Sequence, residues 1–110
     1  MKIAYINPNS TASMTQGIVA TACAALPEAQ IFGLTNTSAP AAIQGKADGD
    51  AALPGLLALL PEARALGADA IVIACFDDTG LAQARARAGC PVLGIGQSSF
   101  VMAGLLGLRF

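Results

Sequence analysis

One cysteine of this chain stands directly before an aromatic residue and two carboxylates, in the segment ACFDDTG that ends a continuous apolar run. These residues are Cys75, Phe76, Asp77 and Asp78. A nearby helix N-terminus favours the thiolate form of a cysteine, whereas neighbouring carboxylates oppose its ionisation. Cys75 could therefore transfer a proton, or it could be a small buried apolar residue. Its position alone does not decide between these interpretations.

Few other groups in this chain could carry out chemistry. Asp78 is well placed as the N-cap of a helix that starts directly after it, and Asp77 has no assigned role. The chain contains no histidine, which excludes Ser-His-Asp and Cys-His catalysis and most zinc sites. We expect Cys23 and Cys90 to lie far from the ACFDDTG segment, as inert packing residues.

Apolar strands and amphipathic helices alternate along the chain and must position these groups. We expect helices between successive strands, a last helix at 97–107, and strands at 2–6, 29–35, 68–76 and 91–96. The unbroken apolar run ADAIVIACF indicates a strand that is covered on both faces. The pattern predicts an α/β domain with a parallel four-stranded sheet and flanking helices.

Local signals predict where some of these elements begin and end. Ser13 and Gln16 have the spacing of a helix capping box. Residues 36–50 form a loop long enough to cover a site, a second helix begins near Asp50, and Pro61 should kink or break it. Residues 108–110 resemble the start of a fifth strand. The predicted inner faces carry Met14, Ile18, Val19, Cys23 and Leu26 on the first helix, and Leu53, Leu56, Leu57, Leu60 and Leu66 on the second.

Three loops should converge where the strands end. NPNST follows the first strand, CFDDTG the third and GQSS the fourth, and the carboxyl ends of parallel strands share one edge of a sheet. Helix N-termini at that edge offer N–H groups that can stabilise an anion without a basic side chain. Turn chemistry explains the Asn and Pro residues on its own. The amides and hydroxyls could also hold amide or carboxylate oxygens of a ligand: Asn7, Asn9, Ser10, Thr11, Gln97 and Ser98.

Composition limits the class of protein. A chain of 110 residues with a net charge of −1 and no run of Lys or Arg gives no sign of binding nucleic acid or an anionic membrane. No apolar run approaches the roughly 20 residues that span a bilayer, and we interpret MKIAYINPN as a strand rather than a signal peptide. Three cysteines without a disulfide pattern fit a reducing cytoplasm.

The chain is unusually apolar for a free-standing domain. Hydrophobic residues make up 55% of it and charged residues only 12%, against about a quarter charged in a typical domain. Either a large face meets a partner, or the chain is one part of a larger protein.

Three segments, in order and at matching spacing, resemble one family. INPNSTASMT, DAIVIACFDDTGL and PVLGIGQSS are similar to the hydantoin and allantoin racemase branch of the Asp/Glu racemase superfamily, over essentially the whole chain. The resemblance implies a flavodoxin-like fold and two similar domains with the active site between them. It also implies one acid/base cysteine from each domain, and neither a metal nor pyridoxal phosphate.

Carried over by residue, the resemblance assigns several positions. Cys75 matches the first catalytic cysteine, and Asn7, Asn9 and Phe76 match positions near the bound substrate. Thr79 stands where family members often have Pro, and many members have Glu in place of Gln97. The second cysteine belongs to a domain that these residues do not include.

Residues 1–110 would therefore be an N-terminal racemase domain, truncated before a second α/β domain, and inactive alone. We expect a cofactor-independent racemase that inverts the carbon next to a carbonyl in a small cyclic ureide, such as a 5-substituted hydantoin or allantoin. The basic residues, which should lie away from the crevice, favour a neutral substrate of this kind; they are Lys2, Lys46, Arg64, Arg85, Arg87 and Arg109.

Two alternatives stay open at this point. The first is an amino-acid racemase, isomerase or decarboxylase of the same superfamily, acting on aspartate, glutamate, maleate or an arylmalonate. The second is a non-catalytic α/β domain that binds a ligand or pairs with itself. Pairing into a homo-oligomer would also bury the apolar excess.

Overall fold

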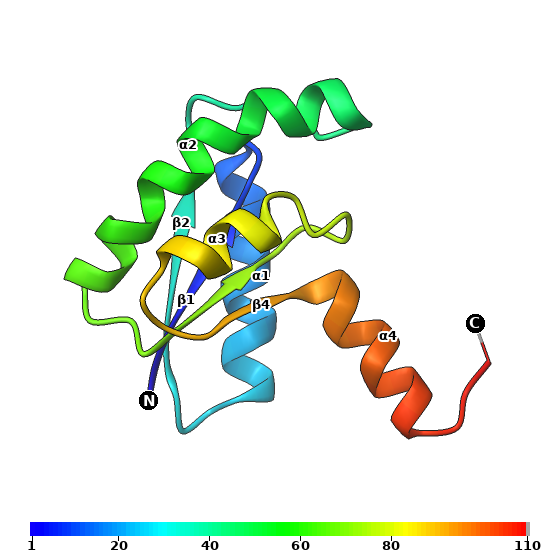
Figure 1. Cartoon of the computed structure of the whole chain (residues 1–110). Coiled ribbons are helices and arrows are strands. Elements are labelled where there is room, and N and C mark those ends of the chain that lie inside the picture. The colour runs from blue at the N-terminus through cyan, green and yellow to red at the C-terminus, as the bar shows by residue number, and fades with distance from the viewer. Residues whose placement is uncertain (110) are drawn as a thin grey trace.

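Four parallel strands form the central sheet, in the order β2-β1-β3-β4 (Figure 1). The computed structural model describes residues 1–109. The strands are β1 (Lys2–Asn7), β2 (Gln30–Thr35), β3 (Ala70–Ile73) and β4 (Val92–Gly94). The predicted parallel four-stranded sheet is confirmed, although β3 and β4 are shorter than the apolar runs that contain them.

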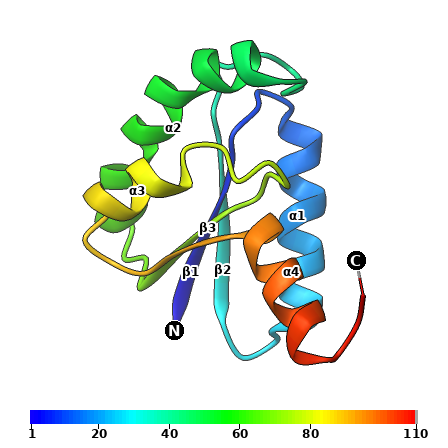
Figure 2. The same ribbon diagram turned by 45° about the vertical axis from the view of Figure 1, so that its right-hand side comes forward.

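Helices lie on both faces of this sheet (Figure 2). They are α1 (Ala12–Ala25), α2 (Lys46–Ala65), α3 (Leu81–Arg87) and α4 (Ile95–Leu105). Helices α2 and α3 cover one face, and α1 covers the opposite face over β1 and β2 (Figures 1 and 2). No helix among residues 1–109 is long and apolar enough to cross a membrane.

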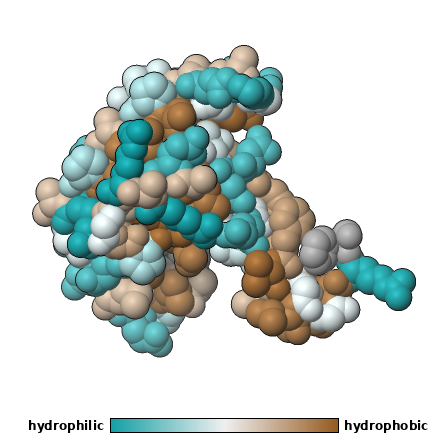
Figure 3. All heavy atoms as spheres, in the orientation of Figure 1, coloured by the Kyte–Doolittle hydropathy of each residue, from teal (hydrophilic) through white to brown (hydrophobic). Residues whose placement is uncertain are grey.

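Helix α4 starts at β4 and projects away from the sheet (Figure 1). Its apolar side chains form the brown segment at the lower right of Figure 3, which has the same orientation. Large apolar residues of this segment are 46–77% exposed; they are Phe100, Val101, Met102, Leu105 and Leu106. The apolar excess of the composition is thus concentrated on one projecting helix.

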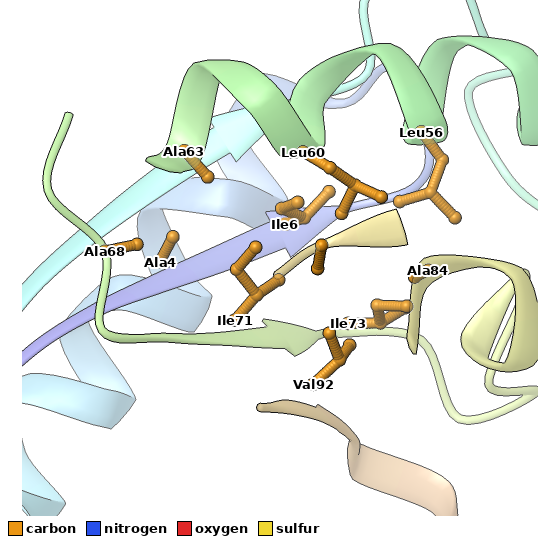
Figure 4. Close-up of a cluster of buried hydrophobic side chains, with 11 residues drawn as sticks. Ala4, Ile6, Leu56, Leu60, Ala63, Ala68, Ile71, Ile73, Ala84 and Val92 are labelled. Atoms are coloured by element: carbon orange, nitrogen blue, oxygen red, sulfur yellow. The ribbon is translucent and has the colours of Figure 1, made fainter. Parts of the chain in front are cut away.

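The core lies between the sheet and α2 with α3 (Figure 4). Register pairs Ala4 with Ile71 and Ile6 with Ile73, so these side chains point to the same face. Leu56 and Leu60 of α2 pack onto them, and Ala84 of α3 completes the cluster. Burying each of the large aliphatic side chains contributes about 1.5–3 kcal/mol, so this face holds the strands in place.

Several predicted boundaries are wrong. Helix α1 begins at Ala12, so Ser13 lies inside its first turn and the predicted capping box is absent. Helix α2 begins at Lys46 rather than near Asp50, because Asp48 Oδ2 accepts the Gln44 N–H at 2.9 Å just before the helix. Pro61 lies inside α2 and does not end it.

The buried side of α1 also differs from the prediction. A Cβ on Gly33 of β2 would lie 2.7 Å from both Thr15 Cγ2 and Val19 Cγ2, so α1 packs closely on that glycine. Thr15 is therefore buried, whereas Met14 is exposed and Cys23 is an exposed free thiol rather than a packing residue.

Two further predictions fail at the ends of elements. Leu66, expected on the inner side of α2, follows that helix and is exposed. Leu108 and Arg109 belong to no strand, and Phe110 lies outside the described residues, so the predicted fifth strand is not seen in the described part of the chain.

Candidate active site

A hollow of about 480 Å³ lies at the carboxyl edge of β1 and β3. It is lined by residues 7–9, Met14 and Ile18 of α1, residues 42–44, residues 74–76 and Ile95. Four of the predicted site residues meet there: Asn7, Asn9, Cys75 and Phe76. The loops after the first and third strands are thus brought together, as the strand order predicts.

Asn7 organises the loop after β1 and is buried. Its Nδ2 donates to Asn9 Oδ1 at 2.9 Å, and to Thr11 O and Thr15 Oγ1, both at 3.1 Å. Its Oδ1 accepts the Asn9 N–H at 3.1 Å. Because the amide is fully used within the protein, Asn7 shapes the wall of the hollow more than it offers groups to a ligand.

The side-chain donor of Asn9 is more weakly bonded than that of Asn7. Its Oδ1 accepts from Asn7 and from the Thr11 N–H at 2.9 Å, which fixes the orientation of the amide. Among the residues that the structure describes, its Nδ2 donates only to Met14 Sδ, at 3.4 Å. A thioether is a weak acceptor, so a carbonyl oxygen in the hollow could replace it.

A third asparagine, which the sequence reasoning missed, holds the loops around the hollow. Asn36 is buried directly after β2, and its Nδ2 donates to Pro8 O at 3.0 Å and to Ala52 O at 2.8 Å. It thereby ties the loop after β1 to α2. Its position at the carboxyl edge of a neighbouring strand was the available signal.

The segment 42–44 supplies the wall opposite β3. Ser10 N–H donates to Pro40 O at 3.0 Å, and Thr11 Oγ1 donates to Ala41 O at 2.7 Å. These bonds hold Ile43 and Gln44 against the hollow. The predicted long loop therefore borders the site. Ser10 and Thr11 hold this loop through hydrogen bonds and do not line the hollow themselves.

Cys75 lies two residues beyond the end of β3, in a tight turn. The Ala74 N–H donates to Ile6 O at 2.9 Å, and the Asp78 N–H donates to Cys75 O at 2.9 Å. The thiol is half-buried and unoxidised, and its Sγ lies 3.6 Å from Thr79 Oγ1. Cys90 is also half-buried, packs against the core and does not line the hollow.

Asp78 caps a helix, as predicted, but not the helix that follows it directly in the sequence. Helix α3 has Gly80 at its N-cap and no side-chain cap. The Asp78 carboxylate instead accepts the Gly96 N–H at 3.0 Å and the Gln97 N–H at 2.7 Å, at the start of α4. A left-handed backbone at Asp78, with φ of 51°, turns the carboxylate toward that helix.

This cap explains the GIG segment. A Cβ on Gly94 would overlap the Asp78 carboxylate, and one on Gly96 would overlap Phe76 O. Both glycines therefore allow close approach of the Cys75 turn to α4.

Phe76 lines the Cys75 hollow, whereas Gln97 and Ser98 of the GQSS segment do not. Phe76 is 57% exposed and packs edge-on against Phe100 of α4, with ring centroids 5.5 Å apart. Gln97 Oε1 accepts from Arg85 Nη2 at 2.7 Å, and Ser98 lines a separate apolar hollow along α4. Gln97 and Ser98 are thus not brought to the Cys75 hollow, and their contact with substrate stays a prediction.

The hollow contains no Asp, Glu, Lys or Arg side chain among its described lining residues. Lys46 lies nearer to the Cys75 hollow than predicted. It lines an adjacent hollow of about 430 Å³ together with Asp77. Its Nζ donates to Asp50 at 2.6 Å, and this hydrogen bond raises the pKa of the exposed Lys46 ammonium. Within residues 1–109, no three His, Cys, Asp or Glu side chains gather closely enough to hold a metal ion.

Known proteins are similar to this chain in sequence and in fold. The family model for Asp/Glu/Hydantoin racemase matches residues 3–110. A hydantoin racemase of Rhizobium meliloti is 43% identical over 111 residues, covering 100% of this chain and 46% of the relative. A hydantoin racemase of Pseudomonas sp. (strain NS671) is 40% identical, covering 100% of this chain and 45% of the relative.

A solved structure agrees with these relatives. Allantoin racemase from Klebsiella pneumoniae superposes with a TM-score of 0.90 at 37% identity, covering 96% of this chain and 43% of that chain. The chain spans less than half the length of each of these three relatives. The sequence match over residues 3–110 and the shared fold show that the chain belongs to the Asp/Glu/hydantoin racemase family.

Proposed function

We propose that this chain is the N-terminal domain of a cofactor-independent racemase that acts on a cyclic ureide. The observation that carries the proposal is Cys75, a half-buried free thiol that lines a hollow without charged side chains among its described lining residues. The relatives named hydantoin racemase and allantoin racemase support the same class of reaction.

The walls of the hollow favour a neutral ring with an apolar substituent. Most of the lining is apolar, including Ile18, Ile43 and Ile95. An amino acid with two carboxylates would meet no cation there, and burying an unpaired charge is costly. A 5-substituted hydantoin instead needs donors for its carbonyl oxygens, and Asn9 Nδ2 is one.

Proton transfer at the carbon next to a carbonyl follows from this placement. The Cys75 thiolate takes the proton from that carbon and becomes a thiol, and the electron pair moves into the ring carbonyl as an enolate. A ureide carbon acid is more acidic than that of an amino acid, which suits a thiolate base. Neutral N–H donors stabilise the enolate oxygen without a metal or a cationic side chain.

Inversion requires a second acid on the opposite face of the ring. We assign that group to a cysteine of a second α/β domain, because the chain spans less than half of its relatives. That domain, or a second copy of the chain in a homo-oligomer, would also cover the apolar α4. Without the second acid, racemisation should be very slow or absent. The proposed location is the cytoplasm, which suits three free cysteines.

The proposal is tested by following the optical rotation of L-5-benzylhydantoin with a protein that joins this chain to its second domain. Cys75→Ala should lower the racemisation rate by about 10²–10⁴, the usual contribution of one general acid or base. Cys90→Ala is the matched control, since Cys90 is half-buried outside the hollow, and it should retain activity.

The same assay separates the alternatives. Turnover of aspartate or glutamate without turnover of hydantoins would replace this proposal with an amino-acid racemase. A stable dimer that turns over neither class would indicate a non-catalytic binding domain.

A further inference from the structure

The turn after β3 places a hydroxyl beside the Cys75 thiol. Thr79 Oγ1 lies 3.6 Å from Cys75 Sγ, within hydrogen-bonding range for sulfur. Each atom is the other's hydrogen-bond partner in the described part of the chain. The proton transfer proposed above uses only the sulfur of Cys75. The contact between Cys75 and Thr79 has no role in that step.

The contact is held by a closed turn rather than by the two side chains alone. The Asp78 N–H donates to Cys75 O at 2.9 Å, and the Leu81 N–H donates to Asp78 O at 3.1 Å. The carboxylate of Asp78 is anchored to the first N–H groups of α4. The backbone of Thr79 therefore cannot move away from Cys75 without breaking bonds on both sides of it.

Ionisation of the thiol fixes the direction of this hydrogen bond. With a neutral thiol, either atom can donate. A thiolate has no hydrogen, so the Thr79 hydroxyl must then be the donor. A donor to the charged form of a group favours that form. The Asp78 carboxylate does not compete for the hydroxyl, because its two oxygens accept N–H groups of α4.

We propose that Thr79 is a positioning residue for Cys75, whose hydroxyl donates to the thiolate and favours the form that takes the proton. This inference rests on the proposed function only in that it gives the thiolate a task. The hydrogen bond itself can be tested in the 110-residue chain without substrate.

The experiment measures the rate of Cys75 alkylation by iodoacetamide between pH 6 and pH 10, resolved by peptide mass spectrometry. Thr79→Val replaces the hydroxyl by a methyl group of similar size, and Thr79→Ser keeps the hydroxyl. We expect Thr79→Val to slow alkylation at neutral pH by roughly tenfold, the effect of losing one hydrogen bond to a charged group. The midpoint of its rate–pH profile should move upward, and Thr79→Ser should follow the wild type.

Cys23 gives an internal control in every sample, because it is an exposed thiol on α1 and its profile should not change. Overlapping profiles for wild type and Thr79→Val would overturn the inference, and so would an equal shift in Thr79→Ser. If Thr79→Val loses its circular dichroism spectrum, Thr79→Ala is compared with Thr79→Ser under the same two criteria.

The outcome is independent of the racemase proposal. A shifted alkylation profile in a protein that racemises nothing would keep the hydrogen bond and reject the enzyme. Racemisation through Cys75 with an unshifted profile would keep the enzyme and reject the role of Thr79.

Discussion

The Asp78 carboxylate anchors the Cys75 turn to the first turn of α4 by accepting the Gly96 and Gln97 N–H groups. Asp78 was expected to cap the helix that follows it in sequence, and it caps α4 instead. Residue type indicates a cap, but a positive φ and the fold select the helix. The position of Asn7 in the hollow could likewise be predicted from the sequence. Its side-chain hydrogen bonds to Asn9, Thr11 and Thr15 could not.

Asp78→Ala tests the cap at this scale. The variant loses two hydrogen bonds to N–H groups, and we expect the free energy of unfolding in urea to fall by about 1–2 kcal/mol. Asp77→Ala is the matched control, since Asp77 is exposed, and should change it by less than about 0.5 kcal/mol. Equal stability of the two variants would show that Asp78 does not anchor α4.

At the scale of elements, the alternation of strands and helices predicted the sheet and its carboxyl edge correctly. Helix boundaries were predicted less well, because tertiary contacts set them. Helix α2 begins earlier than predicted, where Asp48 accepts a backbone N–H. Helix α1 buries Thr15 against β2, because Gly33 has no side chain and allows the helix to pack closely. The loop that borders the hollow was predicted, but its anchor Asn36 depends on α2 packing against the NPN loop.

Gly55→Ala tests this packing. A Cβ at Gly55 of α2 would overlap Asn36 Oδ1 and come close to Ser38, so α2 and the loop after β2 must move apart. Such overpacking should lower the free energy of unfolding by about 1–3 kcal/mol. Gly17→Ala on α1 has open space around the new Cβ and should raise it by about 0.5–1 kcal/mol. Gly55→Ala as stable as the wild type would contradict the close approach of Asn36 to α2.

At the scale of the whole molecule, a closed core contrasts with an exposed apolar helix. The face under α2 and α3 is a closed core, whereas α4 leaves apolar side chains exposed beyond β4 (Figures 3 and 4). Composition indicated either a large apolar face that meets a partner or one part of a larger protein, and it could not place such a face, because the helices have similar proportions of apolar residues. Helix α4 lies beside the Cys75 turn, so under the proposed function a second domain that covers α4 would also lie beside Cys75.

The central claim is that Cys75 removes the proton from one face of the substrate. The most direct measurement is exchange of the carbon-bound proton of each pure 5-benzylhydantoin enantiomer in D₂O, followed by NMR with the complete two-domain protein. We expect the wild type and Cys90→Ala to exchange both enantiomers, and Cys75→Ser to lose exchange of one. Undiminished exchange of both enantiomers by Cys75→Ser would contradict the account.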